Sequence, residues 1–225
     1  MKRALLPLAV LGFLAVSVPA MAVPSRVLFG FSGSTAVELV IDGTTTILAS
    51  DTGWYSALGV HEDSNPNYFV GLCDDGCDPK GEFHDFAVFD LGEGVSATSA
   101  VIRLFNPLIG YISPNPSELY SLYDVSTGVR DLMASQSDAT DIFDDLGSGL
   151  LFGSRTVLSS DAGVYVEITL TADGIDSLNR AIGTWAVGGA VDLSEAPAPD
   201  PVPEPTTLLL LGSGLILGRR LRKRS

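Results

Sequence analysis

Two cysteines, Cys73 and Cys77, are the only ones among the 225 residues of this chain. In an oxidising compartment an even number of cysteines indicates a disulfide, which here would close a small loop. Gly76 favours the tight turn that such a loop needs. A redox pair usually has two residues between its cysteines, whereas this pair has three. We therefore expect a structural disulfide that holds the loop.

Acidic residues crowd the same loop. Asp74, Asp75, Asp78 and Glu82 offer carboxylate oxygens, the ligands that calcium prefers in proteins. Their spacing differs from the EF-hand pattern of acidic residues at alternate positions with a distant Glu. Two interpretations stay open: a calcium site formed by these four residues, and a solvated acidic loop, which the spacing favours. The sequence predicts no obligatory cofactor.

No catalytic motif stands out. The only histidines are His61 and His84, and the sequence alone does not place them together or beside the cysteines as a zinc site would require. The stretch 147–149 (Gly-Ser-Gly) lacks the Gly-x-Ser-x-Gly spacing of a nucleophile elbow, and no glycine-rich loop precedes a helix with a lysine. A catalytic pair of carboxylates stays an open alternative. The fold brings the two acidic residues of a glycosidase together, so they need no fixed spacing in the sequence. We assign no catalytic residue and expect a protein that is not an enzyme.

The aromatic residues of the chain indicate a second candidate function, which is glycan binding. Exposed rings stack on sugar faces, while polar side chains orient the hydroxyl groups. Core packing is the competing interpretation for each ring. Trp54 and Tyr55 are neighbours on an expected strand, so one of the two should point outward. The candidates are Trp54, Tyr55, Tyr68, Tyr111, Tyr120 and Trp185.

The negative charge of the chain excludes some classes of binding partner. The whole chain has a net charge of −14, and residues 23–201 carry 26 acidic against 6 basic side chains. Such a body repels nucleic acid and anionic lipid headgroups. We therefore exclude nucleic-acid binding and expect a solvated, acidic surface.

The N-terminus has the three parts of a secretory signal peptide. A basic pair at positions 2 and 3 precedes the apolar stretch Ala4–Val18. Small residues follow at Ala20 and Ala22, the two positions that a signal peptidase reads. We expect signal peptidase to remove residues 1–22.

The C-terminus has a rigid motif, an apolar segment and a basic end. Pro203-Glu204-Pro205 leads into Thr206–Gly218, a segment of 13 residues. As a helix this segment is ~20 Å long, against a hydrocarbon core of ~30 Å, so it spans a bilayer only marginally. The basic residues that would stay in the cytoplasm are Arg219, Arg220, Arg222, Lys223 and Arg224.

This ending resembles the PEP-CTERM sorting signal of Gram-negative bacteria, whose defining tripeptide is matched residue for residue by Pro203, Glu204 and Pro205. The resemblance implies recognition by an exosortase, a membrane protease-transpeptidase that removes or exchanges the tail. It also implies a body that is held transiently at the inner membrane, facing the periplasm, and then sorted to the cell envelope or to an extracellular polysaccharide matrix. The resemblance covers residues 202–225 and assigns no activity to the rest.

The sequence of the body, residues 23–193, predicts many short strands. Alternation is clean at Val164–Leu170, and the stretch Phe83–Leu91 is apolar on both faces, as in a central strand. We expect a mainly β domain over residues 23–193, an antiparallel jelly-roll-like β-sandwich, followed by a Pro/Ala/acidic linker at 194–201. The remaining expected strands are Arg26–Phe31, Ala36–Ile41, Thr45–Ala49, Trp54–Val60, Asn67–Leu72, Ser99–Phe105, Glu118–Asp124, Leu150–Leu158 and Thr184–Val191.

Two helices are expected. Ala172–Ile182 has Thr171 as N-cap and a face formed by Ile175, Leu178 and Ile182. A second helix is expected at Thr127–Ala134 behind Ser126. Thr140 or Asp141 can cap a further helical turn.

The body itself is similar, more loosely, to ectodomains of other PEP-CTERM proteins and to carbohydrate-binding-type sandwiches, through stretches such as Asn67–Gly71 and Phe86–Leu91. No ligand residue follows from that likeness. The sequence therefore favours an exported, non-catalytic protein of the envelope or matrix. The alternative is a glycan-binding module or a weak glycoside-acting enzyme, with extracellular polysaccharide as its partner.

Overall fold

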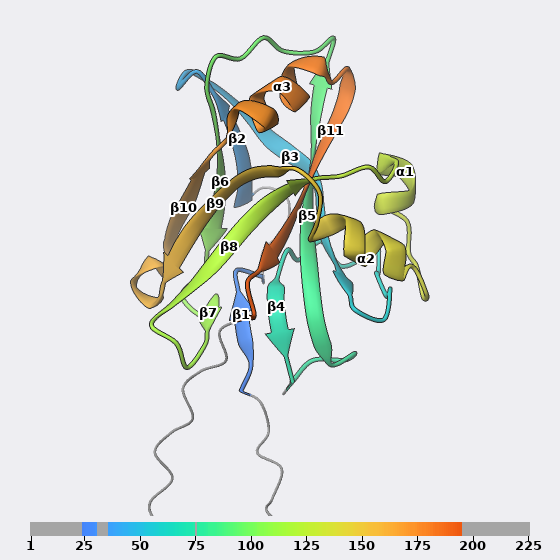
Figure 1. Cartoon of the computed structure of the whole chain (residues 1–225), viewed down its shortest axis with the longest axis vertical. Coiled ribbons are helices and arrows are strands. Elements are labelled where there is room, and N and C mark those ends of the chain that lie inside the picture. Colours follow the sequence, from blue (N-terminus) through green and yellow to red (C-terminus); the bar gives the residue numbers. More distant parts are fainter. Residues whose placement is uncertain (1–23, 31–35, 75, 195–225) are drawn as a thin grey trace, which may run out of the picture.

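The computed structural model describes residues 24–30, 36–74 and 76–194 of the chain. In these residues eleven strands join into one antiparallel sheet (Figure 1). The main path of the sheet runs β10-β6-β2-β3-β5-β11-β8-β9, and β4, β1 and β7 branch from β5. The strands are β1 (Arg26–Leu28), β2 (Val37–Ile41), β3 (Thr45–Ser56), β4 (Val70–Cys73), β5 (Gly81–Gly92), β6 (Ala100–Asn106), β7 (Tyr111–Ile112), β8 (Ser117–Asp124), β9 (Leu151–Leu158), β10 (Val164–Thr169) and β11 (Gly183–Val191).

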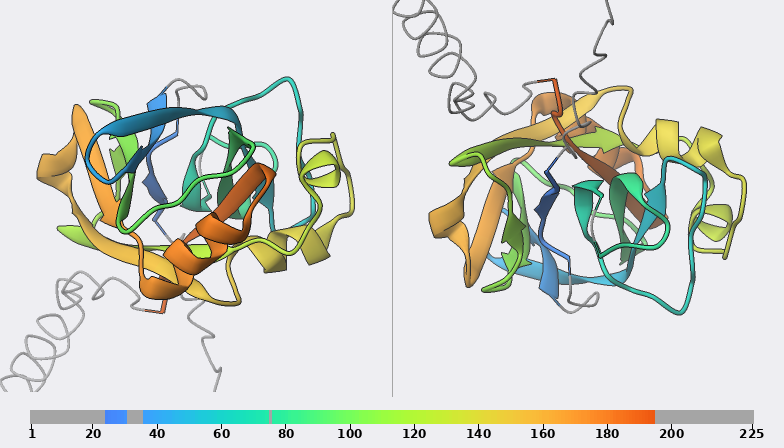
Figure 2. Two further views of the ribbon diagram at one scale, coloured as in Figure 1. Left: turned by 90° about the horizontal axis from the view of Figure 1, so that it is seen from above. Right: turned by 90° about the horizontal axis from the view of Figure 1, so that it is seen from below.

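The sheet curls because β3 belongs to both of its halves. The first part of β3 pairs with β2 and the second part with β5, and the register shifts between Ala49 and Asp51. A bulge of this kind bends a strand and increases its twist. At the far edges, β9 and β10 approach each other where the Thr171 N–H donates a hydrogen bond of 2.7 Å to the Phe152 carbonyl. The result is a half-barrel around one interior (Figure 2).

The mainly β expectation is confirmed, but one curled sheet stands where we expected a jelly-roll-like sandwich of two sheets. Alternation identifies which residues face a core, and it predicted most strands to within a few residues. It does not report whether hydrogen bonding continues from one layer to the next. Asp51, Thr52 and Gly53, residue types that are common in turns, are part of that continuity, since they lie within β3.

Alternate residues of the strands fill the interior. Leu39, Ile102 and Ile168 lie side by side on β2, β6 and β10, and none of them is exposed. Burying one such side chain stabilises the fold by about 1.5–3 kcal/mol. This repetition across neighbouring strands gives the curled sheet one continuous core.

Helices α1 (Val129–Leu132) and α2 (Thr140–Leu146) cover part of the outer face. Phe86 and Val88 of β5 pack beneath them, while Ala87 of the same strand faces the interior. The prediction that β5 is a central strand, apolar on both faces, is confirmed. Figure 2 shows the two helices outside the ring of strands.

The loop before α1 is held by α2. Asp145 accepts hydrogen bonds from the main-chain N–H and the hydroxyl of both Ser126 and Thr127. Although partial burial raises the pKa of the Asp145 carboxyl, these hydrogen bonds outweigh it and lower that pKa. Ser126 therefore bonds to α2, and α1 begins at Val129, two residues after the expected start at Thr127.

Helix α3 (Ala172–Arg180) packs against the core at one end of the half-barrel. The Thr171 hydroxyl accepts a hydrogen bond of 3.2 Å from the Gly174 N–H, so the predicted N-cap is confirmed. Leu178 is fully buried. Ile182 is 79 % exposed, contrary to our expectation, because the helix ends at Arg180 and Ile182 no longer lies on its face.

The remaining predicted segments lie outside the described residues. These are the signal peptide at 1–22, most of the linker, the sorting motif with its apolar segment, and the basic end.

Candidate functional site

The disulfide loop closes as expected. Cys73 and Cys77 are joined, with their Cα atoms 6.0 Å apart. Cys73 is buried at the end of β4, in a cluster with Trp54, Phe69 and Phe83. The bridge therefore fastens the loop to a packed aromatic cluster.

The acidic residues in and near that loop that the structure describes do not converge on a common point. Among the described residues, no group of three His, Cys, Asp or Glu side chains is placed to hold a metal ion. Asp74 lies within the loop, Asp78 directly follows it, and Glu82 lies on β5 beside His84. Asp75 lies outside the described residues. Nothing in the described part supports the calcium interpretation.

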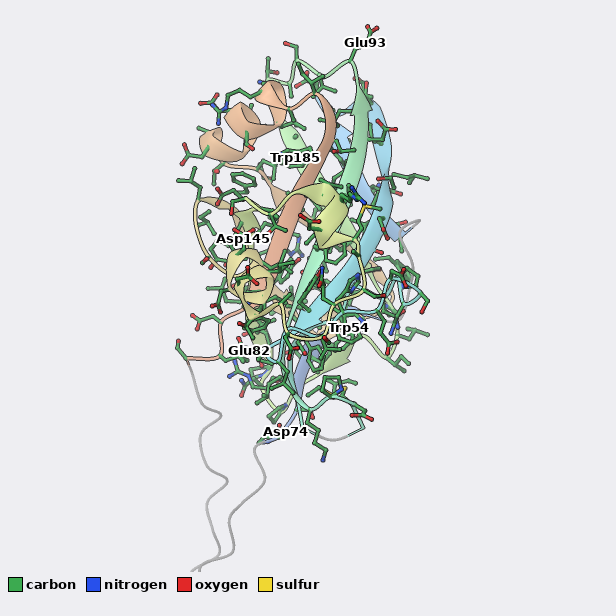
Figure 3. The ribbon with its side chains drawn as sticks, turned by 90° about the vertical axis from the view of Figure 1, so that its right-hand side faces the viewer. Trp54, Asp74, Glu82, Glu93, Asp145 and Trp185 are labelled. Atoms are coloured by element: carbon green, nitrogen blue, oxygen red, sulfur yellow. A yellow bond between two sulfur atoms is a disulfide. The ribbon has the colours of Figure 1, made fainter. Side chains whose placement is uncertain are left out.

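Most aromatic candidates for sugar stacking are core residues. Trp54 and Tyr55 are 4 % and 0 % exposed, so neither ring is open to a sugar, although Tyr55 does lie on the outer face of the sheet. Trp54 packs into the cluster beside the disulfide, and the Tyr55 hydroxyl donates a 3.0 Å hydrogen bond to the Leu132 carbonyl of α1. The sequence did not reveal that short helices cover this face. Tyr68, Tyr120 and Trp185 are buried as well, and Tyr111 is half-buried. Figure 3 shows Trp185 in the upper half and Trp54 in the lower half of the body.

Both histidines pack near the two outer helices. His61 stacks on Tyr55 with ring centroids 4.8 Å apart, and His84 stacks on Phe143 at 3.9 Å. Each Nδ1 lies within hydrogen-bond distance of a main-chain carbonyl, 2.9 Å from Trp54 O for His61 and 2.7 Å from Phe143 O for His84. Burial lowers the pKa of His61. These contacts fix both rings in the packing.

A buried ion pair lies where the chain enters and leaves the sheet. Arg26 of β1 donates from Nε to Glu118 Oε1 at 2.9 Å and from Nη2 to Oε2. Asn115 Nδ2 donates to the same Oε1 at 3.0 Å, and Ser113 Oγ donates there too. Both partners of the ion pair are almost fully buried. The sequence did not predict this pair, because two residues that are 92 positions apart form no local pattern that indicates a contact.

Arg26 also holds the end of the body. Its guanidinium donates to the carbonyls of Asp192 and Leu193 at 3.1 and 3.4 Å. The hydrogen bond to Glu118 raises the pKa of Arg26. For Glu118, burial raises the pKa, but the hydrogen bonds from Arg26 and Ser113 outweigh it and lower that pKa. Arg26 thus ties the first strand to the residues that follow β11, and we name this set of contacts the base network.

A groove crosses the outer face of β5, β11 and β8. β11 presents Ala190 there, and the neighbouring strands carry larger side chains: Ser121 and Tyr123 on β8, Glu82 and His84 on β5. The hollow between them measures about 320 Å³. Figure 3 shows Glu82 between Asp145 above and Asp74 below.

A second hollow of about 410 Å³ adjoins the first. The two share Leu119 and Asp192, and the second is further lined by Ser117, Thr156 and the base network. Hydrogen bonds from Ser194 lower the pKa of Asp192, as does the nearby Arg26 charge. We name the two hollows together the outer groove.

Residues 201–224 match the PEP-CTERM protein-sorting motif. The match includes Pro203, Glu204 and Pro205 and confirms the resemblance inferred from them. A PEP-CTERM motif implies an exported protein that an exosortase sorts to the cell surface. No curated protein and no solved structure matches the chain.

Within the residues that the structure describes, no helix has the length and apolar character needed to cross a membrane.

Proposed function

We propose that this chain is an exported, non-catalytic protein of the cell envelope or extracellular matrix, delivered through its C-terminal sorting signal. One observation carries the proposal: the PEP-CTERM match at residues 201–224. Signal peptidase would remove residues 1–22, and the exosortase would act on the tail after the protein has been held transiently at the inner membrane. The body would then be released to the envelope or matrix.

The arrangement of the body supports this role. The motif begins ten residues after the end of β11 at Val191, so a short linker separates it from the sheet. The base network holds Asp192 and Leu193, the two residues before that linker, against β1. Packing and carbonyl contacts of His61 and His84 support a structural part for both rings. The excess of acidic side chains suits a solvated exported body.

The test is cell fractionation with an epitope tag in the body. The full chain should lose its tail and reach the cell surface or medium. Glu204→Ala, which breaks the motif, should leave an unprocessed chain in the inner membrane. Glu93→Ala removes an exposed carboxylate at the far end of the body and serves as the matched control (Figure 3). Normal processing of the Glu204→Ala chain would overturn the proposal.

A second candidate function is a glycan-binding module. The outer groove favours it, since its hollows fall in the size range of ligand sites, roughly 300–1,000 Å³.

A further inference from the structure

The outer groove exists because one strand carries small residues. Gly188 and Ala190 lie on the outer face of β11, between β5 and β8, whereas Gly189 between them faces the interior beside Tyr120 and Asp85. A side chain at Gly188 would collide with the main chain of Leu146, since an added Cβ would lie 2.5 Å from that carbonyl oxygen. Helix α2 therefore sits close over Gly188 and ends beside the groove. Ala190 lies just beyond the helix and leaves the hollow open.

Hydroxyl groups in the hollow have free hydrogen-bonding capacity. Ser121 is only 8 % exposed, yet its hydroxyl has no hydrogen-bond partner among the described residues. The Tyr123 hydroxyl likewise has none there, and its ring is half-buried. Neither hydroxyl oxygen is among the buried polar atoms that lack a partner in the described residues, so both reach solvent in the hollow, where a hydroxyl group of a ligand can take the place of water.

Each carboxylate of the groove already has a neighbour that hydrogen-bonds to it. Glu82 Oε1 lies 3.3 Å from His84 Nε2, Glu118 accepts from Arg26, and Asp192 Oδ1 accepts a hydrogen bond of 2.9 Å from the Ser194 N–H. An anionic ligand would meet these carboxylates and the strong negative charge of the body. A cationic ligand would have to compete with partners already in place. The pairing therefore favours a ligand without charge.

The shape favours a chain-like ligand. The two hollows meet at Leu119 and Asp192, so the groove continues from β5 across β11 to β8 and its neighbour β9. Tyr123 offers a ring for stacking, while Ser121 and Glu82 offer polar atoms beside it. Rings and hydroxyl-directed polar groups are how proteins hold sugars.

We propose that the outer groove binds an uncharged, hydroxyl-rich oligosaccharide, with Ser121, Tyr123 and Glu82 contacting its hydroxyl groups. This inference rests on the second candidate function, glycan binding, and gives it a place and a ligand class.

The test is titration calorimetry on the full chain, purified in a detergent without a sugar headgroup. The probes are uncharged hexasaccharides of glucose, mannose and galactose, together with a hexamer of galacturonic acid. At least one uncharged probe should bind, and the acidic hexamer should not. Ser121→Ala and Tyr123→Ala should each weaken binding by about tenfold. Ala190→Leu should abolish it, because the added side chain fills the floor without removing any polar group.

Tyr165→Ala is the matched control, since Tyr165 is a half-buried tyrosine on the outer face of β10 that packs against Arg103 and lies outside the groove. Thermal unfolding of each variant shows whether the fold is retained, and Tyr123→Phe, which removes only the hydroxyl, is the gentler substitution if Tyr123→Ala unfolds.

The outcomes separate the hypotheses. If an uncharged probe binds the Ala190→Leu variant as tightly as it binds the original chain, the outer groove is not the binding site, although the protein still binds glycans. Tighter binding of the acidic hexamer overturns the ligand class. No binding of any probe overturns glycan binding and the groove together, and leaves the export proposal to its own fractionation test.

Discussion

The Tyr120 hydroxyl donates a hydrogen bond of 2.9 Å to Asp85 Oδ1 in the interior of the half-barrel. The second carboxyl oxygen, Oδ2, is buried without a hydrogen-bond partner among the described residues. Burial raises the pKa of Asp85 from 3.8 to about 8. Asp85 is therefore protonated at neutral pH and places a neutral carboxyl beside a cavity of about 10 Å³, room for about one water molecule.

Asp85→Asn should change how stability depends on pH. The unfolded chain loses the Asp85 proton near pH 4, whereas the folded protein keeps it until about pH 8. The stability that this group contributes is complete below pH 4 and falls as the pH rises to 8, by an amount on the order of 5 kcal/mol. Asn keeps an oxygen for Tyr120 and cannot ionise, so urea unfolding should show the variant gaining stability over the original chain from pH 5 to pH 8. Asp176→Asn, at an exposed position, should show no such gain. An equal difference at both pH values would contradict the assignment.

Gly189→Ala should disrupt the same pair. A Cβ at Gly189 would lie 2.1 Å from the Tyr120 hydroxyl oxygen and 2.2 Å from Asp85 Oδ1. Overpacking of this kind typically destabilises by about 1–3 kcal/mol. Chemical unfolding should detect the loss. At Gly128 the nearest atom would be 4.0 Å from the added Cβ, so Gly128→Ala should have little effect.

Arg26→Ala should be among the most damaging single changes. It leaves the Glu118 carboxylate buried without its basic partner, which costs about 3–5 kcal/mol. Adding Glu118→Gln removes the stranded charge and should restore part of the loss. Arg103→Ala breaks partly exposed pairs with Glu38 and Glu167, each worth at most about 1 kcal/mol. If Arg26→Ala and Arg103→Ala lower the free energy of unfolding in urea equally, the base network stabilises the fold no more than the partly exposed ion pairs of Arg103 do.

Removing the disulfide should have a small effect on global stability. The bridge closes a loop of only five residues, for which chain entropy predicts about 2 kcal/mol at most. The double variant Cys73→Ala/Cys77→Ala should fold and unfold cooperatively, with a modest drop in melting temperature. The original chain in reductant should show a similar drop, and that sample is the control. Complete unfolding in reductant would mean that the bridge supports more than its loop.

The strands were readable from sequence because their side chains alternate. β10 and β6 follow the predicted pattern, with Ile168 and Ile102 inward and Glu167 and Arg103 outward. Where both faces of a strand are covered, the alternation of side chains no longer shows which residues are exposed to solvent. Tyr55 is buried although it lies on the outer face, because α1 and α2 cover it, and neither helix is long enough to show a clear apolar period.

The candidate site was less predictable than the fold. The groove depends on Ala190 being small between two strands from distant parts of the chain, and only the strand order reveals that. The two-residue strand β7 (Tyr111–Ile112) escaped prediction because it is too short to alternate. The base network joins residues 92 positions apart and leaves no local signal.

The position of β11 governs how the body responds to mechanical load. β11 is hydrogen-bonded on both sides, to β5 along Gly183–Gly189 and to β8 along Val187–Val191. A pull on the residues after Val191, directed along the strand, stretches these hydrogen bonds together instead of opening them one by one. Arg26 adds a further link just beyond the strand end, through the Asp192 and Leu193 carbonyls. A body tethered by its C-terminal side thus meets tension with a strand that is hydrogen-bonded to two neighbours, in shear.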